Sequence, residues 1–244
     1  MFKHKRIVGV LLVPAAFLAL AAGGNDGKGE EVELDEAEVF IEWNSTDGDF
    51  GIQFFWDGDA WDRMRVENSE GKTCLNVRAR DNLQEQGLTE GFFESEELEP
   101  DELSMEEFLE RFPEGEYEFE GKTLEGEELE GETEFTHVIP VPPANLFPAE
   151  GQQVNAAVPL IVSCDAVTED LEGNPLAPEL YELVVENTDD ETFVFSVVLP
   201  GDAANPSATV PPEFLEPGGN YKLEVIVQEE SHNRSITETS FTTL

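Results

Sequence analysis

The chain has 244 residues, 39% of them hydrophobic and 17 of them Phe, which is enough to bury cores for two domains of ordinary size. Its 13 Lys and Arg against 55 Asp and Glu give a formal net charge of -42 at pH 7. This large negative charge repels phosphate groups and therefore argues against nucleic acid and anionic lipid surfaces as partners. Cations, basic proteins and neutral ligands are left as candidates.

Residues 1–22 have the composition of an export signal. The segment starts with three basic residues, Lys3, Lys5 and Arg6. An apolar run from Ile7 to Leu20 follows, and Ala19 and Ala21 frame an A-x-A cleavage site. The run is short for a spanning helix, so we expect no membrane span in the mature chain, with an uncleaved anchor as the alternative.

The stretch LALAAGGNDGKGE resembles the front of a bacterial lipoprotein, in which a cysteine follows a Leu-Ala-Ala type box. Gly23 stands where the lipidated cysteine would be. Because no thiol can be acylated there, we expect a protein that is not lipidated and is released into the periplasm or the medium. Residues 23–36 are rich in Gly and acids and predict a flexible tether, with order beginning at Ala37.

Residues 37–137 predict a small β-rich domain. Apolar residues alternate with polar ones in two runs, over residues 39–43 and 52–56, and a third strand is expected over 73–78. The motifs TDGD and DGD are typical of turns, so two successive hairpin-like units are expected.

One short helix is predicted over residues 104–112. Ser104 followed three residues later by Glu107 is a capping-box pattern, and the apolar residues after it fall at helical spacing until Pro113. Beyond this helix, Tyr117 and Phe119 alternate with glutamates, which predicts a hairpin with one apolar and one glutamate face.

Between Glu90 and Glu134 there are 20 acids and only two basic residues, Arg111 and Lys122. Like charges that face each other across a sheet are destabilising. Counterions, a bound divalent cation or a basic partner would offset this repulsion, and diffuse screening by salt is the simpler alternative.

Prolines 140, 142 and 143 mark the break between two domains, because they favour an extended connection and prevent a helix. From Val158 onward, strand-like runs recur at short intervals with turn residues between nearly all of them. Six or seven such strands without a helical pattern predict an antiparallel β-sandwich.

Residues 139–244 resemble the fibronectin type III family. The resemblance rests on the proline-rich start, the LIVSCDAV run, and a corner formed by Leu215, Pro217 and Tyr221. It implies a mainly β protein in which a sandwich of this type (138–244) follows the small β-rich domain with one short helix. Cys164 departs from the family, which usually has a core tryptophan there, so Phe193, Phe195 or Phe214 would have to fill the space. No RGD-type tripeptide occurs, so adhesive roles of some members do not carry over.

The first domain is similar to a group of exported bacterial proteins of unassigned role, through segments such as NSTDGDFGIQFFWDGDAW and ELSMEEFLERFPEG. This resemblance implies no chemistry. The two cysteines, Cys74 and Cys164, lie one in each domain; we expect buried or inert thiols, with an interdomain disulfide as the alternative.

Two kinds of ligand site are conceivable in the first domain. The acidic turns supply oxygen ligands suited to Ca²⁺, namely Asp47, Asp49, Asp57 and Asp59. They do not match the twelve-residue EF-hand loop, and Asp-Gly is also common hairpin chemistry. Three tryptophans could form a sugar-stacking platform, although their spacing favours one shared core face: Trp43, Trp56 and Trp61.

Catalysis has little support in the sequence. His137 and His232 have no partner pattern, and no G-x-S-x-G, HExxH or phosphate-binding loop occurs. We therefore expect a non-enzymatic, exported interaction or scaffold protein of the bacterial cell envelope or medium, without a cofactor, whose partner is a protein or cell surface of basic character. The alternative is a calcium- or carbohydrate-binding protein that uses the acidic or aromatic face of the first domain.

Overall fold

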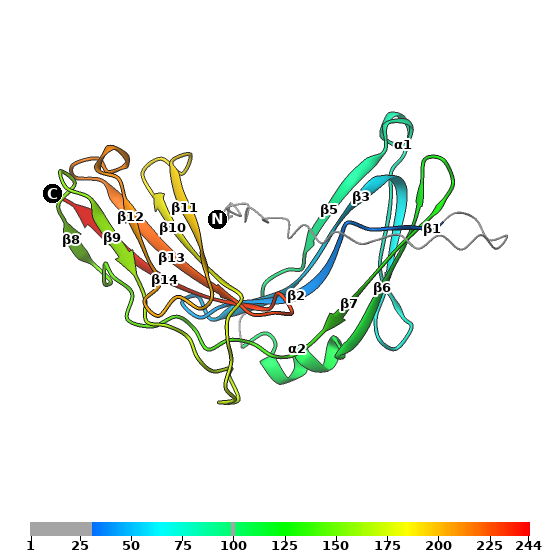
Figure 1. Ribbon diagram of the computed structural model, residues 1–244, viewed down its shortest axis with the longest axis horizontal. Coiled ribbons are helices and arrows are strands. Elements are labelled where there is room, and N and C mark those ends of the chain that lie inside the picture. Colours follow the sequence, from blue (N-terminus) through cyan, green and yellow to red (C-terminus); the bar gives the residue numbers. More distant parts are fainter. Residues whose placement is uncertain (1–30, 99–100) are drawn as a thin grey trace.

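The computed structural model describes residues 31–98 and 101–244, so the proposed export signal (1–22) and Gly23 lie outside the described residues. The described chain is mainly β and U-shaped, and one twelve-stranded sheet runs through both arms (Figure 1). Among these residues, no helix has both the length and the apolar character needed to cross a membrane.

The N-terminal half forms one arm of the U, and its second strand meets the last strand of the C-terminal half at the base (Figure 1). Its elements are β1 (Glu31–Glu33), β2 (Glu36–Asn44), β3 (Asp49–Glu67), β4 (Thr73–Arg78), α1 (Asn82–Gln86), β5 (Leu88–Glu94), α2 (Met105–Arg111), β6 (Gly115–Thr123) and β7 (Glu128–Phe135).

The C-terminal half forms the other arm. Its elements are β8 (Gln152–Val154), β9 (Leu160–Ser163), β10 (Leu180–Asn187), β11 (Val194–Pro200), β12 (Ser207–Val210), a 3-10 turn η1 (Pro212–Phe214), β13 (Asn220–Gln228) and β14 (Arg234–Thr243). The large sheet has the order β1-β7-β6-β3-β2-β14-β13-β10-β11, with β4 and β5 on β3 and β8 on β14; β9 and β12 form a second sheet.

The two hairpin-like units predicted for residues 39–66 are instead β2 and a single long strand, β3. The DGD motif at Asp57 is not a turn between strands but an interior part of β3, where the register with β5 shifts before Trp61. The first part of β3 pairs with β2 and β5 and the last part with β4 and β6. Because this one strand belongs to two sets of neighbours, it bends at the shift instead of ending there.

The first core lies on the outer side of its arm. Trp56 and Trp61 are fully buried in it, and Trp56 stacks on Phe93 with ring centroids 5.1 Å apart. Gly91 of β5 faces Trp56 across the sheet, and a Cβ there would lie 2.3 Å from Trp56 Cζ2. Trp43 packs partly buried against the same core, which confirms that the three tryptophans share a core face.

The predicted helix and glutamate hairpin are both confirmed. In α2, the Ser104 hydroxyl accepts a hydrogen bond from Glu107 N, and the Glu107 carboxylate accepts one from Ser104 N, as a capping box requires. In the hairpin β6–β7, Tyr117 and Phe119 are buried while glutamates pair directly across the strands: Glu116 with Glu134, Glu118 with Glu132, and Glu120 with Glu130.

Order begins earlier than expected, inside the segment 23–36 that the sequence predicts as a tether. Strand β1 pairs in parallel with β7, placing Val32 beside Leu129. Val32 and Leu34 also pack against the first core. A short strand with one apolar residue in two carries too little periodicity to be recognised in an acidic, Gly-rich segment.

The C-terminal half is an antiparallel β-sandwich, as predicted. Strands β9 and β12 pack over β10, β13 and β14, and the side chains between the two sheets form the second core. At the corner, the Tyr221 hydroxyl accepts a hydrogen bond from Glu216 N at 2.7 Å and lies 3.4 Å from Phe214 O, while Leu215 is buried beside it. This is the tyrosine corner that the sequence indicated.

Two of the three phenylalanines expected to compensate for Cys164 pack against the same core. Cys164 is buried in the second core, and Phe195 and Phe214 pack partly buried against that core with their ring centroids 6.1 Å apart. Phe193, the third residue expected to compensate, is 56% exposed and takes no part.

Candidate functional site

The two halves are joined by a buried polar junction between β2 and β14, which pair in parallel. Asn233, fully buried just before β14, accepts a hydrogen bond from Ile41 N at 2.7 Å through its side-chain oxygen. Its amide nitrogen donates to the backbone oxygens of Thr136 and Val138, both at 2.9 Å. One side chain thus binds β2, the end of the hairpin β6–β7 and β14 together, so the proline-rich segment after Ile139 is not the sole link between the halves.

Arg234 completes the junction from the other face. It is 1% exposed, and its guanidinium carbon lies 4.2 Å from the centroid of the Phe40 ring on β2. Its Nη2 donates to Gln228 Oε1 at 2.9 Å, and its Nη1 lies 4.0 Å from the Glu42 carboxylate. A cation over an aromatic face with water excluded is a favourable contact, and here it fixes β14 on β2.

We call the concave side of the large sheet the inner face. The two cores lie on the outer sides of the arms, with β9 and β12 outside one and α2, β6 and β7 outside the other (Figure 1). Alternation along β13 places Leu223 and Val225 in the second core, so Lys222, Glu224 and Ile226 point to the inner face. On β2, Ile41 lies in the first core and the alternate residues Glu38, Phe40 and Glu42 line the inner face.

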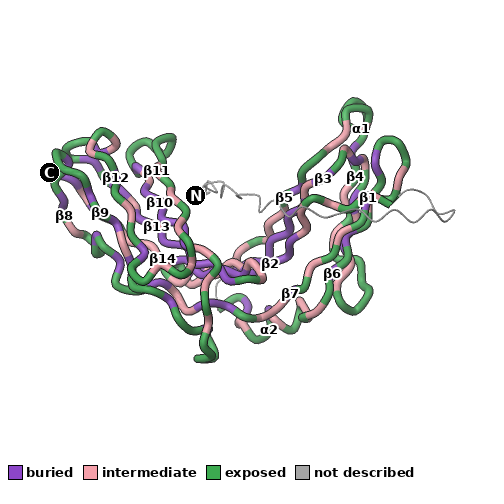
Figure 2. Tube along the Cα trace, viewed as in Figure 1, coloured by how far each residue is buried: buried purple, intermediate pink, exposed green. Residues whose placement is uncertain are grey.

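The floor of the inner face is apolar although it belongs to neither core. Five buried residues from different strands form it: Phe40, Phe55, Val184, Ile226 and Ile236. Figure 2 shows the same buried stretch along β2, β14 and β13 at the base of the U. Towards the ends of the face the apolar residues become exposed, with Phe92 of β5 at 41% on one arm and Val194 and Val198 of β11 at 37% on the other.

Two glutamates on this floor, Glu38 and Glu42, have raised pKa values. Burial raises the pKa of Glu42 to about 7; Arg234 opposes the rise, and Glu94, Glu97 and Glu224 add to it. Burial likewise raises the pKa of Glu38 to about 7, again against Arg234. The inner face is therefore a cluster of carboxyls that hold protons more tightly than free ones, and a nearby cation would return their pKa values towards normal.

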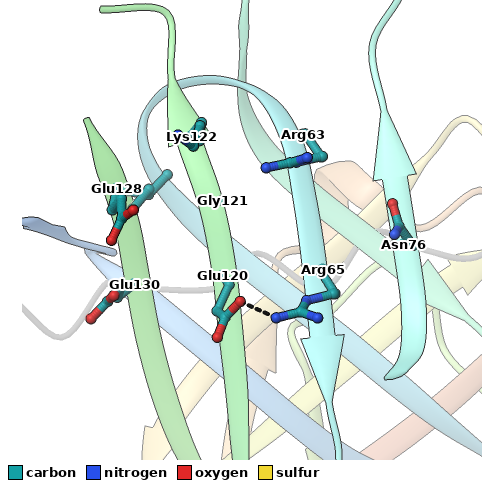
Figure 3. Close-up of a pocket in the computed structure, with 9 residues that line it drawn as sticks. Arg63, Arg65, Asn76, Glu120, Gly121, Lys122, Glu128 and Glu130 are labelled. Carbon is teal, nitrogen blue, oxygen red and sulfur yellow. Dashed lines mark hydrogen bonds and ion pairs between the residues drawn. The ribbon is translucent and has the colours of Figure 1, made fainter. Parts of the chain in front are cut away.

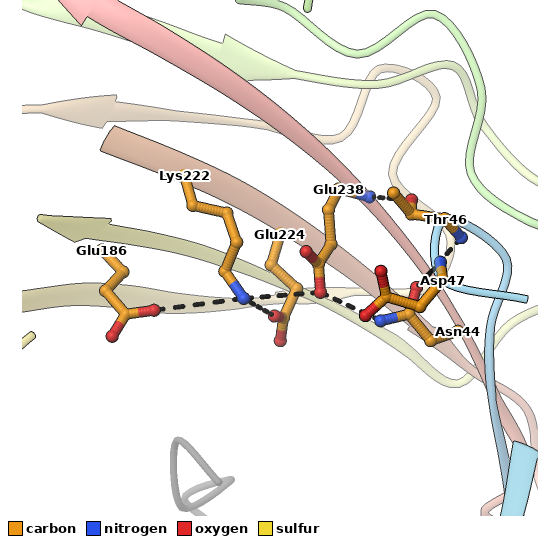
Figure 4. Close-up of polar contacts among 7 residues, drawn as sticks. All are labelled: Asn44, Thr46, Asp47, Glu186, Lys222, Glu224 and Glu238. Carbon is orange, nitrogen blue, oxygen red and sulfur yellow. Dashed lines mark hydrogen bonds and ion pairs between the residues drawn. The ribbon is translucent and has the colours of Figure 1, made fainter. Parts of the chain in front are cut away.

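On the C-terminal side of the junction, three glutamates of the inner face form ion pairs with one lysine, Lys222. Lys222 Nζ lies 3.1 Å from Glu224, 3.4 Å from Glu238 and 4.0 Å from Glu186 (Figure 4). Burial lowers the pKa of Lys222, but these carboxylates outweigh it and the net shift is upward. Glu238 also accepts a hydrogen bond from Asn44 at 3.0 Å, which carries the network from β13 through β14 to β2.

The four aspartates predicted as calcium ligands are not brought together. Asp49 pairs with Asn44 at one end of the β2–β3 ladder, and Asp57 pairs with Glu36 at the other. Eight residues of extended strand separate them, roughly 26 Å at about 3.3 Å per residue. Asp47 and Asp59 lie near these two ends, so at most one pair could contact a given ion.

Two other carboxylate clusters have the spacing of a metal site. One joins Glu42, Glu94 and Glu97 on the inner face, with one oxygen of each within 4.8 Å of the others. The second joins Glu67, Glu118 and Glu120, but Arg65 already forms ion pairs with Glu67 and Glu120. The first cluster could not be predicted from the sequence, because its members come from β2, the end of β5 and the segment after it.

The tryptophans, cysteines and histidines singled out in the sequence do not form a binding site together in the described part of the chain. Trp56 and Trp61 are 0% exposed, so the tryptophans do not form a sugar-stacking platform. Cys74 is exposed on β4, Cys164 is buried in the second core, and both are free thiols. His137 Nε2 donates to Phe112 O at 2.8 Å, and His232 lies 3.3 Å from Glu38, with burial lowering the pKa of His232.

No protein-family model matches the chain, and no curated protein matches it in sequence. Three solved structures are similar to it. The FN1–FN3 domains of chicken CNTN1 are 12% identical with a TM-score of 0.38, and the match covers 89% of this chain and 66% of that one. A tetra-tandem repeat in the extending region of a large adhesion protein is 13% identical with a TM-score of 0.28, and the match covers 85% of this chain and 48% of that one. The BSP domain of a biofilm associated protein is 14% identical with a TM-score of 0.25, and the match covers 86% of this chain and 29% of that one. The chain therefore spans less than two thirds of each of these chains, and likenesses this distant say nothing about function.

Proposed function

We propose that this protein is a non-enzymatic interaction or scaffold module, exported to the bacterial cell envelope or medium, that binds a cationic partner across its inner face. The observation that carries the proposal is the continuity of this face across both halves, held rigid by the junction at Asn233 and Arg234. Export itself rests on the sequence of residues 1–22, and release without a lipid rests on Gly23.

The chemistry of the face indicates the partner. Glutamates at the centre, among them Glu42 and Glu224, favour Lys or Arg side chains, and their burial strengthens each contact relative to one in water. Exposed Phe92, Val194 and Val198 at the two ends favour apolar groups. An extended segment in which basic and apolar residues alternate matches this arrangement, and β5 and β11 leave sheet edges where such a segment could add.

A binding titration tests this proposal. A peptide of alternating Lys and Val should bind saturably and a Glu/Val peptide of equal length should not, with affinity falling as salt rises. The triple variant E42Q/E224Q/E238Q should weaken binding at least about tenfold. The matched control E116Q/E118Q/E134Q removes the same charge from exposed positions on the hairpin β6–β7. Equal weakening by both variants would reduce the effect to overall charge and refute a site on the inner face.

Calcium binding is a second candidate, because the cluster of Glu42, Glu94 and Glu97 has suitable spacing. Calcium–oxygen distances are about 2.3–2.6 Å, so two ligand oxygens on one ion lie up to about 5 Å apart. The carboxylate oxygens of this cluster lie within 4.8 Å of one another and therefore meet this condition. Calcium should then raise the Tm more than sodium at equal ionic strength, and E97Q should abolish the difference. If substitution of Asp47 and Asp49 abolishes it instead, the ion binds at the predicted turn.

A further inference from the structure

An arginine- and lysine-lined hollow on the N-terminal arm stands apart from the inner face. It lies on β3, β4, β6 and β7 and has a volume of about 440 Å³ (Figure 3). Nine of the 13 Lys and Arg belong to the described residues, since Lys3, Lys5, Arg6 and Lys28 precede Glu31. Three of these nine, Arg63, Arg65 and Lys122, line the hollow.

Strand register places cations side by side here. Arg63 of β3 is directly opposite Lys122 of β6 on one side and Arg78 of β4 on the other. Directly opposed residues have Cβ atoms about 4.5–5.5 Å apart, and like charges at that spacing are destabilising. In a chain with a net charge of -42, three adjacent strands therefore carry a row of three positive charges.

None of these three basic side chains forms an ion pair within the described residues. Arg65, two residues further along β3 on the same face, forms ion pairs with Glu120 and Glu67. By contrast, no ion pair joins Arg63, Arg78 or Lys122 to any carboxylate of residues 31–98 and 101–244. Glu128 of β7 is directly opposite Lys122, so this end of the row has one acidic neighbour, and Glu130 borders the hollow beside it.

We propose that Arg63 and Lys122 bind a single oxyanion group, a carboxylate or a phosphate, on a ligand that is otherwise neutral, while Arg78 adds positive charge from the neighbouring strand β4. The Arg63 guanidinium offers a planar fork of N–H donors that matches an oxyanion, Lys122 adds an ammonium group, and the amide of Asn76 adds a neutral hydrogen-bonding group at the rim. Glu120, Glu128 and Glu130 surround the row, so a second negative charge on the ligand would be repelled. The hollow has the size of a small-ligand site.

The site is tested with glucuronate, inorganic phosphate and glucose as probes on the full protein. In NMR titrations, saturable chemical-shift changes with glucuronate would show that the site binds a carboxylate. Saturable changes with phosphate would show that it binds a phosphate, and either result supports the proposal. Glucose alone should give no saturable change. Saturable binding of neither anion, or binding of glucose as tight as that of glucuronate, would overturn it.

Variants locate the binding. R63Q/K122Q should weaken anion binding at least about tenfold. The control R80Q/R111Q, which removes the same charge from exposed residues outside the hollow, should change it less than about twofold. The first variant removes the repulsion between Arg63 and Lys122 and also the attraction between Lys122 and Glu128, so a cooperative thermal transition without ligand is the check that it is folded. Equal weakening by the two variants would refute a local site.

Discussion

Arg234 of β14 lies over the ring of Phe40 of β2, 4.2 Å from its centroid, and this contact joins the two arms of the protein. The pairing of β2 with β14 in parallel extends one sheet from the first core to the second. Domains connected only by a proline-rich segment are expected to move relative to each other. A buried cation on an aromatic ring, together with the hydrogen bonds of Asn233, gives this protein a fixed angle between its arms.

Replacing Arg234 with Met tests this coupling. We expect a loss of about 3–5 kcal/mol in the free energy of unfolding near neutral pH, because Glu42 and Glu38 lose the charge that opposes their burial. The loss should shrink below about pH 5, where both carboxyls are protonated. Urea unfolding followed separately by tryptophan fluorescence, which reports the first half, and by circular dichroism should separate into two transitions. Coincident transitions at unchanged stability would contradict a coupling role.

Stability should fall as pH rises from about 4.5 to about 7. The pKa of Glu42 is about 7 in the folded protein against 4.5 for an ordinary Glu, so the folded state binds more protons in this window. Stability that is fully present below about pH 4.5 is therefore lost as Glu42 ionises, by roughly 3 kcal/mol at most. E42Q should reduce this slope in a series of urea unfolding curves. The same substitution at exposed Glu118 is the control, and equal slopes in wild type and E42Q would refute the assignment.

Two tyrosines make a matched pair. Tyr221→Phe removes the hydroxyl that accepts from Glu216 N at 2.7 Å, and we expect it to cost about 1 kcal/mol. The Tyr117 hydroxyl is buried without a hydrogen-bond partner in the described structure, so Tyr117→Phe should be neutral or stabilising. Thermal unfolding of both variants checks the pair. A Tyr117→Phe loss as large as that of Tyr221→Phe would show that the buried hydroxyl has a partner.

Gly91→Ala should be strongly destabilising, by about 3 kcal/mol, because the new methyl group would lie 2.3 Å from Trp56 Cζ2. The Trp56 ring is held in place by Phe93 and by Trp61, whose ring centroid lies 5.7 Å away, so it cannot simply rotate away. In a Trp56→Phe background the same substitution should cost clearly less, and a double-mutant cycle measures the difference. Additive losses would mean that the clash is not with Trp56.

Local patterns were sufficient wherever residues close in the chain decide the structure. The capping box at Ser104 and Glu107, the alternation of the glutamate hairpin and the corner at Leu215 and Tyr221 each depend on contacts within a few residues or on one hairpin. Such contacts leave a spacing that can be read directly. The bend of β3 at Asp57 could not be read in this way, since Asp-Gly has the same chemistry in a turn and in a register shift.

Charge, periodicity and turn residues are local properties of the chain, so they were enough to predict a mainly β, strongly acidic protein with a sandwich in its second half. Three relationships became visible in the folded chain alone: β14 pairs with β2, Glu42 lies close to Glu94 and Glu97, and Arg63 lies between Lys122 and Arg78. Each of these relationships joins different strands, and register between strands is set by how whole sheets pack and not by spacing along one strand. For the same reason the sequence around Arg234, a single basic residue near the C-terminus, does not indicate that this side chain lies on the inner face, over Phe40.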